Sequence, residues 1–455
     1  MADIEKIITD NIWKQFNTLR RYLDYTTAKK IFTEIFFLKL LNDQLKNKNK
    51  YFCRIVNGKI KLDTNYQTIE QFYENLSVFI EANEFLKNFK FEIFVLKEKV
   101  DNKLMLEIIN SIDSIYTSME KKPSWSFMLF INIMLRNGKG EVMTSPGINK
   151  LISRLLKNKN MEELYDPTIG TGMLAVDTAA GHEDVRIYGQ DIDGEMLDIC
   201  RMLLILDERI EDVSNLEEGN TIVNPGHIEG DTIKTFDVVV SNPPFGVKEW
   251  GYNEIAENGD NYNRFRRGLP SKMLADYAFI SHVIESMNDK GIAVMVENTG
   301  VLFKEGAEGA IREKIVKGNI IDAIIALPNN MMYGTAIQVN IIIFNNDKKT
   351  NDILFIDTST EVQASKVLTC FTDKNIEDIT KTYNERNEIG GFSRRVSMDE
   401  IAENGFNLNV QRYIEAKDEK EELDIDAIGR EINMLIVKLR GTQENIKKIL
   451  KKENY

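Results

Sequence analysis

Residues 236–245 read Phe-Asp-Val-Val-Val-Ser-Asn-Pro-Pro-Phe and carry the strongest structural signal in the chain. The first six are mostly β-branched or aromatic and are followed by two prolines, which is typical of a short buried strand. In an open α/β sheet, ligands bind outside the carboxyl ends of the strands. The sequence therefore predicts that Asn242–Phe245 lies at a ligand-binding edge.

This four-residue motif suits the binding of a planar amino group. The side-chain oxygen of Asn242 and the backbone carbonyl of Pro243 can each accept one hydrogen from an exocyclic amino group. Phe245 can stack on the ring that carries this group, and Pro244 completes the turn. We take these four residues as candidate catalytic residues; the alternative is a Pro-Pro turn that ends a strand and binds nothing.

The composition indicates a folded protein with more than one domain. The chain has 455 residues, of which 43% are apolar, and this length favours two or three domains. No apolar run reaches the ~18 residues of a membrane span, and no signal peptide precedes the first helix, so no membrane partner is expected. The three cysteines and three histidines are scattered, which favours a cytoplasmic location and predicts no metal site.

The net charge is −13, whereas a protein that grips DNA alone usually has a basic excess. A nucleic-acid substrate would therefore require a local basic surface or a partner. The densest basic cluster near the motif is Arg264, Arg266 and Arg267, within residues 246–274. We expect this segment to close over DNA; the alternative is a solvated loop without a ligand.

Three domains are expected. Residues 1–136 have helical periodicity and few glycines, whereas residues 137–415 alternate between strand and helix patterns, which is typical of a doubly wound, mainly parallel α/β sheet. The expected strands are 162–166, 185–191, 236–241, 291–297, 320–327 and 339–344, and the expected helices are 148–156, 172–180, 194–206, 275–288 and 307–317.

The third domain, residues 416–455, contains apolar side chains at heptad spacing. These are Ile425, Ile428, Ile432, Leu435, Leu439, Thr442, Ile446 and Ile449. Such a seam predicts a coiled-coil helix that meets a partner chain. The alternative is a helix that packs on its own domain.

A second motif begins at the expected strand 162–166. Asp166 is followed by a turn that contains Gly170, Thr171 and Gly172, where glycines let a ligand approach the backbone. Asp191 ends the next expected strand about 20 residues later, the place of an acid that binds a ribose diol. The third glycine of a dinucleotide site is absent, which favours a cofactor without a pyrophosphate.

Three further residues, Asp231, Thr144 and Ser145, complete the expected cofactor site. Asp231 ends a third possible strand and is expected to face an adenine. Thr144 and Ser145 precede Pro146, a pattern typical of a helix N-terminus.

Together the two motifs resemble the amino-group DNA methyltransferases that use S-adenosylmethionine, in which D-P-x-x-G-x-G precedes N-P-P-F or N-P-P-Y. The match is closer to the modification subunit of type I restriction-modification systems and covers nearly the whole chain. The similar strings are Tyr188-Gly189-Gln190-Asp191, Ser271-Lys272, Ala275-Asp276-Tyr277-Ala278-Phe279, Val301-Leu302-Phe303, Leu327-Pro328 and Asn407-Leu408-Asn409. Thr144-Ser145-Pro146 departs from the family's T-P-R, which lies near the methionine end of the cofactor.

The resemblance implies a Rossmann-like methyltransferase fold with a mostly parallel, seven-stranded sheet, a helical N-terminal domain and a helical tail. It implies methyl transfer from S-adenosylmethionine to N6 of adenine in duplex DNA, with the base flipped into the pocket. It also implies a complex of two copies with one DNA-specificity subunit, and a restriction subunit as a further partner.

Two other functions stay open at this point. Protein glutamine methyltransferases also grip a planar amide with N-P-P-Y, although the basic and aromatic segment 246–274 favours DNA. The other is a non-catalytic scaffold that binds only through its tail. The intact Asp166, Gly170, Gly172, Asp191 and Asn242 argue against it.

Overall fold

The computed structural model describes residues 2–47, 69–87, 89–95, 101–104, 122–135, 145–182, 184–332, 337–359 and 369–414, together with 434–435, 438–439 and 442. Residues 1–414 form one compact unit and residues 415–455 a second. Thr144, most of the tail seam and the residues between 135 and 145 lie outside the described part of the chain.

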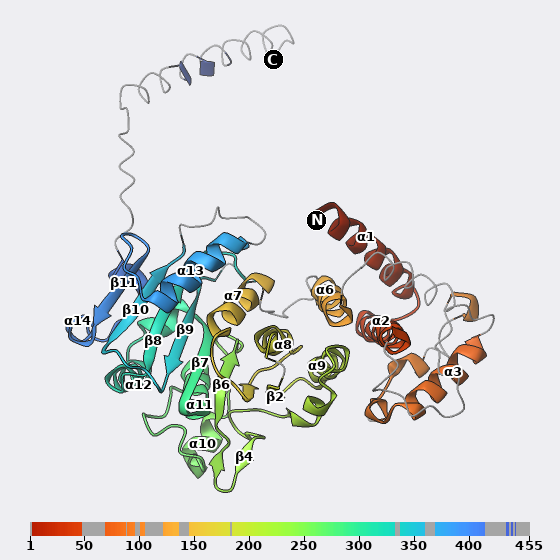
Figure 1. Ribbon diagram of the computed structural model, residues 1–455, viewed down its shortest axis with the longest axis horizontal. Coiled ribbons are helices and arrows are strands. Elements are labelled where there is room, and N and C mark those ends of the chain that lie inside the picture. The colour runs from red at the N-terminus through yellow and green to blue at the C-terminus, as the bar shows by residue number, and fades with distance from the viewer. Residues whose placement is uncertain are drawn as a thin grey trace, which may run out of the picture. The chain divides into compact units, whose positions relative to one another are not determined.

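A nine-stranded sheet lies at the centre of the larger unit, in the order β11-β10-β8-β9-β7-β6-β1-β2-β3 (Figure 1). Its strands are β1 (Glu163–Asp166), β2 (Arg186–Asp191), β3 (Leu216–Glu218), β6 (Phe236–Ser241), β7 (Met287–Asn298), β8 (Ile321–Ala326), β9 (Val339–Asn345), β10 (Asp352–Asp357) and β11 (Ser393–Ser397). Neighbours are parallel except that β9 runs antiparallel to β7 and β8, and β11 antiparallel to β10. A separate hairpin contains β4 (Ile228–Glu229) and β5 (Thr232–Ile233).

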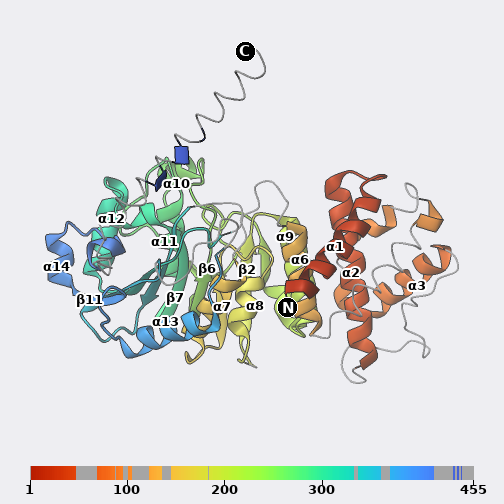
Figure 2. The same ribbon diagram turned by 90° about the horizontal axis from the view of Figure 1, so that it is seen from above.

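Helices cover both faces of the sheet (Figures 1 and 2). The helices are α1 (Ala2–Leu19), α2 (Tyr25–Asn47), α3 (Ile69–Ala82), α6 (Pro123–Leu135), α7 (Pro146–Leu156), α8 (Met173–Ala179), α9 (Gly194–Leu206), α10 (Tyr252–Asn258), α11 (Asp276–Glu285), α12 (Ala307–Lys317), α13 (Asp373–Glu385) and α14 (Met398–Glu403). Short 3-10 helices are η1 (Glu84–Leu86), η2 (Glu92–Val95), η3 (Ile210–Asn215), η4 (Thr299–Leu302) and η5 (Val410–Arg412).

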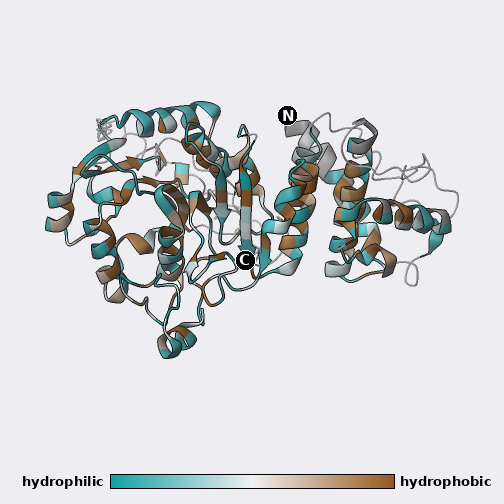
Figure 3. Ribbon diagram, turned by 60° about the horizontal axis from the view of Figure 1, so that its bottom comes forward, coloured by the Kyte–Doolittle hydropathy of each residue, from teal (hydrophilic) through white to brown (hydrophobic). Residues whose placement is uncertain are grey.

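The alternation of side chains along a strand divides the interior into two apolar cores. On β6, Val238 and Val240 belong to the core that contains α7, α8, α9 and α13. Val239 belongs to the opposite core, which contains α11 and α12. Figure 3 shows apolar residues in the strands and along the helices that pack on them. An apolar strand buried on both faces is typical of parallel sheets with helices on each side.

The N-terminal helices join the first of these cores. Gln44 on α2 donates from Nε2 to the carbonyl of Leu206 at the end of α9, at 3.1 Å. Glu34, also on α2, is buried and accepts from the backbone N–H groups of Glu92 and Ile93 at 2.9 and 2.8 Å. Burial raises the pKa of Glu34 to about 7. Polar contacts of α2 with α9 and with η2 therefore supplement the apolar packing of these helices.

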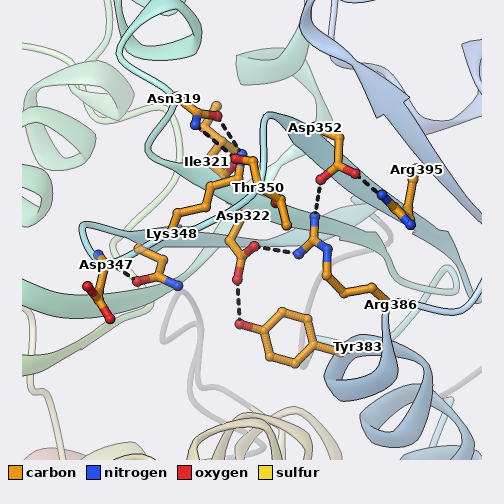
Figure 4. Close-up of polar contacts among 11 residues, drawn as sticks. Asn319, Ile321, Asp322, Asp347, Lys348, Thr350, Asp352, Tyr383, Arg386 and Arg395 are labelled. Carbon is orange, nitrogen blue, oxygen red and sulfur yellow. Dashed lines mark hydrogen bonds and ion pairs between the residues drawn. The ribbon is translucent and has the colours of Figure 1, made fainter.

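A buried ion network fastens α13 to the amino ends of β8 and β10 (Figure 4). Arg386 donates from Nη1 to Asp322 and from Nη2 to Asp352, both at 2.6 Å. Tyr383 donates its hydroxyl to the other oxygen of Asp322 at 2.9 Å. Arg395 on β11 donates from Nε to Asp352 at 2.7 Å. The network thus links three strands and a helix at the edge opposite the carboxyl ends.

The sequence predictions for the sheet are largely confirmed, and the differences lie at its edges. The six expected strands and the expected helices of residues 145–345 are present. The expected helix 275–288 ends at Glu285, because β7 already begins at Met287. The sheet has nine strands instead of seven. The sequence does not predict β3, because two of its three residues are glutamates. Strands β10 and β11 follow the last expected strand, 339–344.

In the smaller unit, only part of the heptad seam is described. Leu435, Leu439 and Thr442 are helical and exposed, with the two leucines each 59% exposed. Thr442 donates its hydroxyl to the carbonyl of Lys438 at 2.9 Å, the contact of a helical turn. The other five seam positions, Ile425, Ile428, Ile432, Ile446 and Ile449, lie outside the described residues. Within the described chain, no helix has the length and hydropathy needed to cross a bilayer.

Candidate active site

A cavity of about 600 Å³ opens at the carboxyl edge of the sheet, where β1, β2 and β6 end. Its lining includes Asp166, Gly170, Thr171, Asp191, Asn242, Pro243, Pro244 and Phe245, and also Leu135, Ile192, Asp193, Asn220, Thr221, Trp250 and Phe279. The two sequence motifs are therefore brought together around a single space. Its volume lies within the range of small-molecule sites.

The turn after β1 supplies one wall of the cavity. Asp166 is buried at the end of the strand, and its Oδ1 accepts from the backbone N–H of Thr168 at 2.9 Å. Burial and, to a smaller extent, the nearby carboxylate of Asp191 raise the pKa of Asp166 to about 7. Asp166 is thus a carboxyl group that changes charge near neutral pH.

Two glycines shape this turn in different ways. Gly170 adopts a left-handed conformation, with φ of 51°, and its N–H donates to Oδ2 of Asp191 at 2.8 Å. Gly172 has φ of 80°, and a Cβ placed on it would lie 2.6 Å from Sγ of Cys200 on α9. Gly172 does not line the cavity; its missing side chain lets α8 and α9 pack closely. The glycine turn therefore serves both the cavity and the packing beneath it.

Asp191 is held in place at the end of β2. Its two oxygens accept from different backbone N–H groups, those of Gly170 at 2.8 Å and Asp193 at 2.9 Å. Burial raises the pKa of Asp191. Beside it, Ile192 exposes 70% of its surface among the residues that line the cavity. A fixed carboxylate next to an apolar surface suits a ligand with a diol and a flat ring.

The catalytic motif follows β6 directly. Asn242 is half-buried and Pro243 buried, and all four motif residues line the cavity. The next residue, Gly246, donates its N–H to Oδ1 of Asp276 at the start of α11, at 3.0 Å. Lys304 binds the other oxygen of Asp276 at 2.7 Å. An ion pair thus supports the chain just beyond the motif.

Asp231 does not belong to this site. It is exposed in the turn between β4 and β5, a hairpin outside the nine-stranded sheet, and it does not line the cavity. The third strand is instead β3, and the residues after it, Gly219–Ile222, line the cavity. The signal at β3 is weak because the strand is short and acidic. Asn220, in the loop after β3, lines the cavity, whereas Asp231 does not.

The first helix of the domain starts as predicted but away from the cavity. Ser145 is the N-cap of α7, and its hydroxyl accepts from the N–H of Ile148 at 3.4 Å. Ser145 is buried and is not part of the cavity lining, while Thr144 lies outside the described residues. Among the described residues no group of three His, Cys, Asp or Glu could hold a metal ion.

The prediction that residues 246–274 present three arginines to DNA is wrong for Arg264. Its side chain is buried, and its donors bind groups within the protein. Arg266 and Arg267 both contact Glu285 on α11. The three arginines of this cluster therefore pair with two carboxylates of the protein, those of Asp260 and Glu285. The segment also contains the helix α10.

Replacing Asp166 should change the pH dependence of stability. Because the pKa is about 7 in the folded chain and 3.8 ordinarily, the folded protein binds the proton more tightly. Its contribution to stability is therefore present at low pH and is lost as the pH rises toward 7. Asp166→Asn should raise the melting temperature relative to wild type more at pH 8 than at pH 5.

Thermal melting at the two pH values measures this difference. Asp289→Asn, which removes an exposed carboxylate, is the matched control. A shift that is equal at both pH values in Asp166→Asn would contradict the assignment.

Comparisons with known proteins agree with this geometry. Residues 132–422 match the model of the N-6 DNA Methylase family. The type I restriction enzyme MpnII methylase subunit of Mycoplasma pneumoniae is 31% identical over 365 residues, which are 76% of this chain and 67% of the relative. The MjaVIII methylase subunit of Methanocaldococcus jannaschii is 30% identical over 312 residues, 65% of this chain but only 53% of the relative. The chain thus spans between half and two thirds of their length.

The fold also matches a solved structure. The type I restriction-modification system methyltransferase subunit from Streptococcus thermophilus superimposes with a TM-score of 0.72 at 21% identity, over 90% of this chain and all of that one. This likeness, with the mostly parallel sheet, confirms the predicted Rossmann-like methyltransferase fold. The chain belongs to the N-6 DNA methylase family, in the branch of the type I restriction enzyme methylase subunits.

Proposed function

We propose that this chain transfers a methyl group from S-adenosylmethionine to N6 of adenine in duplex DNA, as the modification subunit of a type I restriction-modification complex. One observation carries the proposal: the Asn242–Phe245 motif and the Gly170–Asp191 pair line the same cavity. Family membership favours DNA over the protein-glutamine alternative.

The residues around the cavity fit S-adenosylmethionine. The carboxylate of Asp191 would hold the ribose diol, and Ile192 and Asn220 would contact the adenine ring of the cofactor. The buried carboxyl of Asp166 would face its cationic methionine end. When bound, the cofactor supplies a methyl carbon that its sulfonium already activates.

The protein's part in the reaction is to hold the target base and exclude water. Adenine N6 is hidden in a duplex, so the base must be flipped into the cavity. Phe245 would stack on the base, while the Asn242 side-chain oxygen and the Pro243 carbonyl would accept the two N6 hydrogens. These acceptors stabilise the positive charge that develops on N6 during attack. Since neutral N6 already has a lone pair, alignment suffices for attack without a general base. The C–S bond of the cofactor breaks as the N–C bond forms, and the cationic N6 then releases one hydrogen as a proton to solvent.

The balance of charge supports assembly with a DNA-reading partner. The net charge is −13, and Arg266 and Arg267 share Glu285, which offsets one of their two positive charges. We therefore assign most of the grip on DNA to a specificity subunit, with two copies of this chain per complex and a restriction subunit as a further partner. The exposed Leu435 and Leu439 of the tail are the proposed contact with that partner.

Methyl transfer to DNA tests the proposal directly. The full chain, co-expressed with its specificity subunit, is incubated with labelled S-adenosylmethionine and duplex DNA, and the digested nucleosides are separated. Label in N6-methyladenine is expected. Label in N4-methylcytosine, or in protein glutamine alone, would refute it.

Cofactor binding should depend on Asp191. Asp191→Ala removes the proposed diol acceptor, and a lost hydrogen bond to a charged group costs roughly 1.5–3 kcal/mol, or about 10- to 100-fold in affinity. Calorimetry with S-adenosylmethionine measures the change. Asp198→Ala, on α9 and not part of the cavity lining, is the control and should bind normally. Unchanged affinity in Asp191→Ala would show that the cofactor binds elsewhere.

A further inference from the structure

Arg264 is a buried cation in the segment that follows the catalytic motif. Its side chain is 2% exposed, and its closest acidic partner, Asp260, is 8% exposed. The Arg264 side chain reaches out of its own segment toward the backbone of Thr221 and Ile222, in the wall of the cavity after β3. A buried charge is costly to desolvate unless every donor is bound. The groups that accept hydrogen bonds from Arg264 therefore show which parts of the protein this buried charge holds together.

All five N–H donors of the Arg264 guanidinium have acceptors. Nε and Nη2 donate to Oδ1 of Asp260 at 3.0 and 2.9 Å. Nη2 also donates to the carbonyl of Ile222 at 2.8 Å. Nη1 donates to the carbonyl of Thr221 at 3.1 Å and faces Nδ1 of His282 at 3.3 Å. A lysine, with three donors, cannot satisfy this set.

The contact with His282 fixes the state of that ring. Because a guanidinium cannot accept, Nδ1 of His282 must accept from Arg264, which leaves the imidazole neutral with its proton on Nε2. Burial and the charge of Arg264 both lower the pKa of His282, in agreement. Nε2 then donates to the hydroxyl of Tyr165 at 3.1 Å. Tyr165 immediately precedes Asp166 on β1, so the chain of bonds ends beside the cofactor turn.

A second path leads from Arg264 to the same turn. The hydroxyl of Thr221, whose carbonyl Arg264 binds, donates to the carbonyl of Pro167 at 2.6 Å. Pro167 and Thr221 both line the cavity. Arg264 thus supports two walls of the cavity from outside it, since Arg264 is itself absent from the lining.

The segment that carries Arg264 also borders the target side of the cavity. Trp250 lines the cavity and donates from Nε1 to the carbonyl of Ser271 at 3.0 Å. The ring of Phe265, next to Arg264, lies 6.1 Å from that of Trp250. A Cβ on Gly251 would lie 2.2 Å from Cγ2 of Val223, so the backbone at Gly251 passes very close to the Val223 side chain. Residues 250–265 and 219–223 are therefore packed as one body.

We propose that Arg264 is a positioning residue that couples the cofactor walls of the cavity to segment 250–265, so that cofactor binding orders the segment beside the target base. The inference rests on the proposed use of S-adenosylmethionine. It replaces the role in DNA contact that the sequence suggested for Arg264. By reciprocity, a base held against the segment would strengthen cofactor binding by the same factor.

Hydrogen exchange and calorimetry on the full chain test the coupling, with S-adenosylmethionine as the probe. In the wild type, the cofactor should slow amide exchange within residues 252–262, although none of them lines the cavity. Arg264→Lys keeps the charge but should weaken cofactor binding roughly tenfold, because acceptors in the wall lose their donors. The cofactor should then no longer protect residues 252–262. Arg266→Met, with a side chain 54% exposed, is the control and should behave as wild type.

The outcomes distinguish a failure of the proposed coupling through Arg264 from a failure of the proposed use of S-adenosylmethionine. A wild type that binds no S-adenosylmethionine overturns both. A wild type that binds it, with equal affinity and equal protection in Arg264→Lys, overturns only the coupling. If Arg264→Lys does not fold, the coupling is tested with Thr221→Val and Thr221→Ser, because the Thr221 hydroxyl binds the carbonyl of Pro167. The valine variant should lose the protection and the serine variant, which keeps the hydroxyl, should retain it; protection in both refutes the coupling.

Discussion

Asn242→Ala should lower the rate of methyl transfer at least a hundredfold while the protein still folds and binds S-adenosylmethionine. The side-chain oxygen of Asn242 is proposed to stabilise charge that exists only during transfer, and removing such a contact costs about 3 kcal/mol of transition-state stabilisation. Labelled methyl transfer under single-turnover conditions measures the rate. Phe245→Ala is the informative comparison, because losing the stacking surface should weaken capture of the base more than it slows the chemical step.

Cofactor affinity and turnover together show whether a slow Asn242→Ala variant has lost chemistry or has only lost its cofactor. Calorimetry should give Asn242→Ala the cofactor affinity of the wild type, since Asp191 and the glycine turn are unchanged. Turnover within a few-fold of wild type would mean that Asn242–Phe245 is only a turn that ends β6. That result would contradict the proposed chemistry without affecting the fold.

Arg386→Met should destabilise the larger unit by roughly 3 kcal/mol, the cost of leaving a buried carboxylate unpaired. The side chains of Asp322 and Asp352 are only 9% and 12% exposed. Asp352 keeps Arg395, so most of the loss should arise at Asp322. Chemical denaturation measures the free energy of unfolding.

The control for this variant lies nearby. Arg394→Met removes a half-exposed arginine that pairs with Glu400, and exposed pairs contribute about 0–1 kcal/mol. Equal losses in the two variants would show that burial does not strengthen the network. Cofactor affinity should be unchanged in both, because the network lies at the opposite edge of the sheet from the cavity.

The sequence was sufficient for the sheet and the two motifs because these depend on local patterns. The strand before Asn242 is largely apolar, whereas the strand that ends at Asp166 has only Leu164 and Tyr165 as apolar residues. Both strands are short and stopped by proline, and each motif lies at the carboxyl end of its strand. Parallel strands end at a common edge, so two motifs far apart in the chain could be placed together. The cavity contains both.

Long-range contacts explain what the sequence did not reveal. From the sequence alone Arg264 resembles a DNA-binding residue, because no neighbouring residue in the chain indicates that its partners are Thr221, Ile222 and His282. Gly172 was assigned to the cofactor because glycine turns often bind ligands, yet its neighbour in space is Cys200. Asp231 was misplaced because β3 is too short and too acidic to be counted as a strand.

The two outer strands of the sheet have a consequence for aggregation. Strand β3 has only three residues, and β11 carries the exposed arginines Arg394 and Arg395. A short edge and a charged edge both discourage a neighbouring chain from adding a strand. The sheet is therefore protected against edge-to-edge polymerisation at both ends. Such edges disfavour complexes formed by strand addition, so the sheet can remain a rigid support for the cavity.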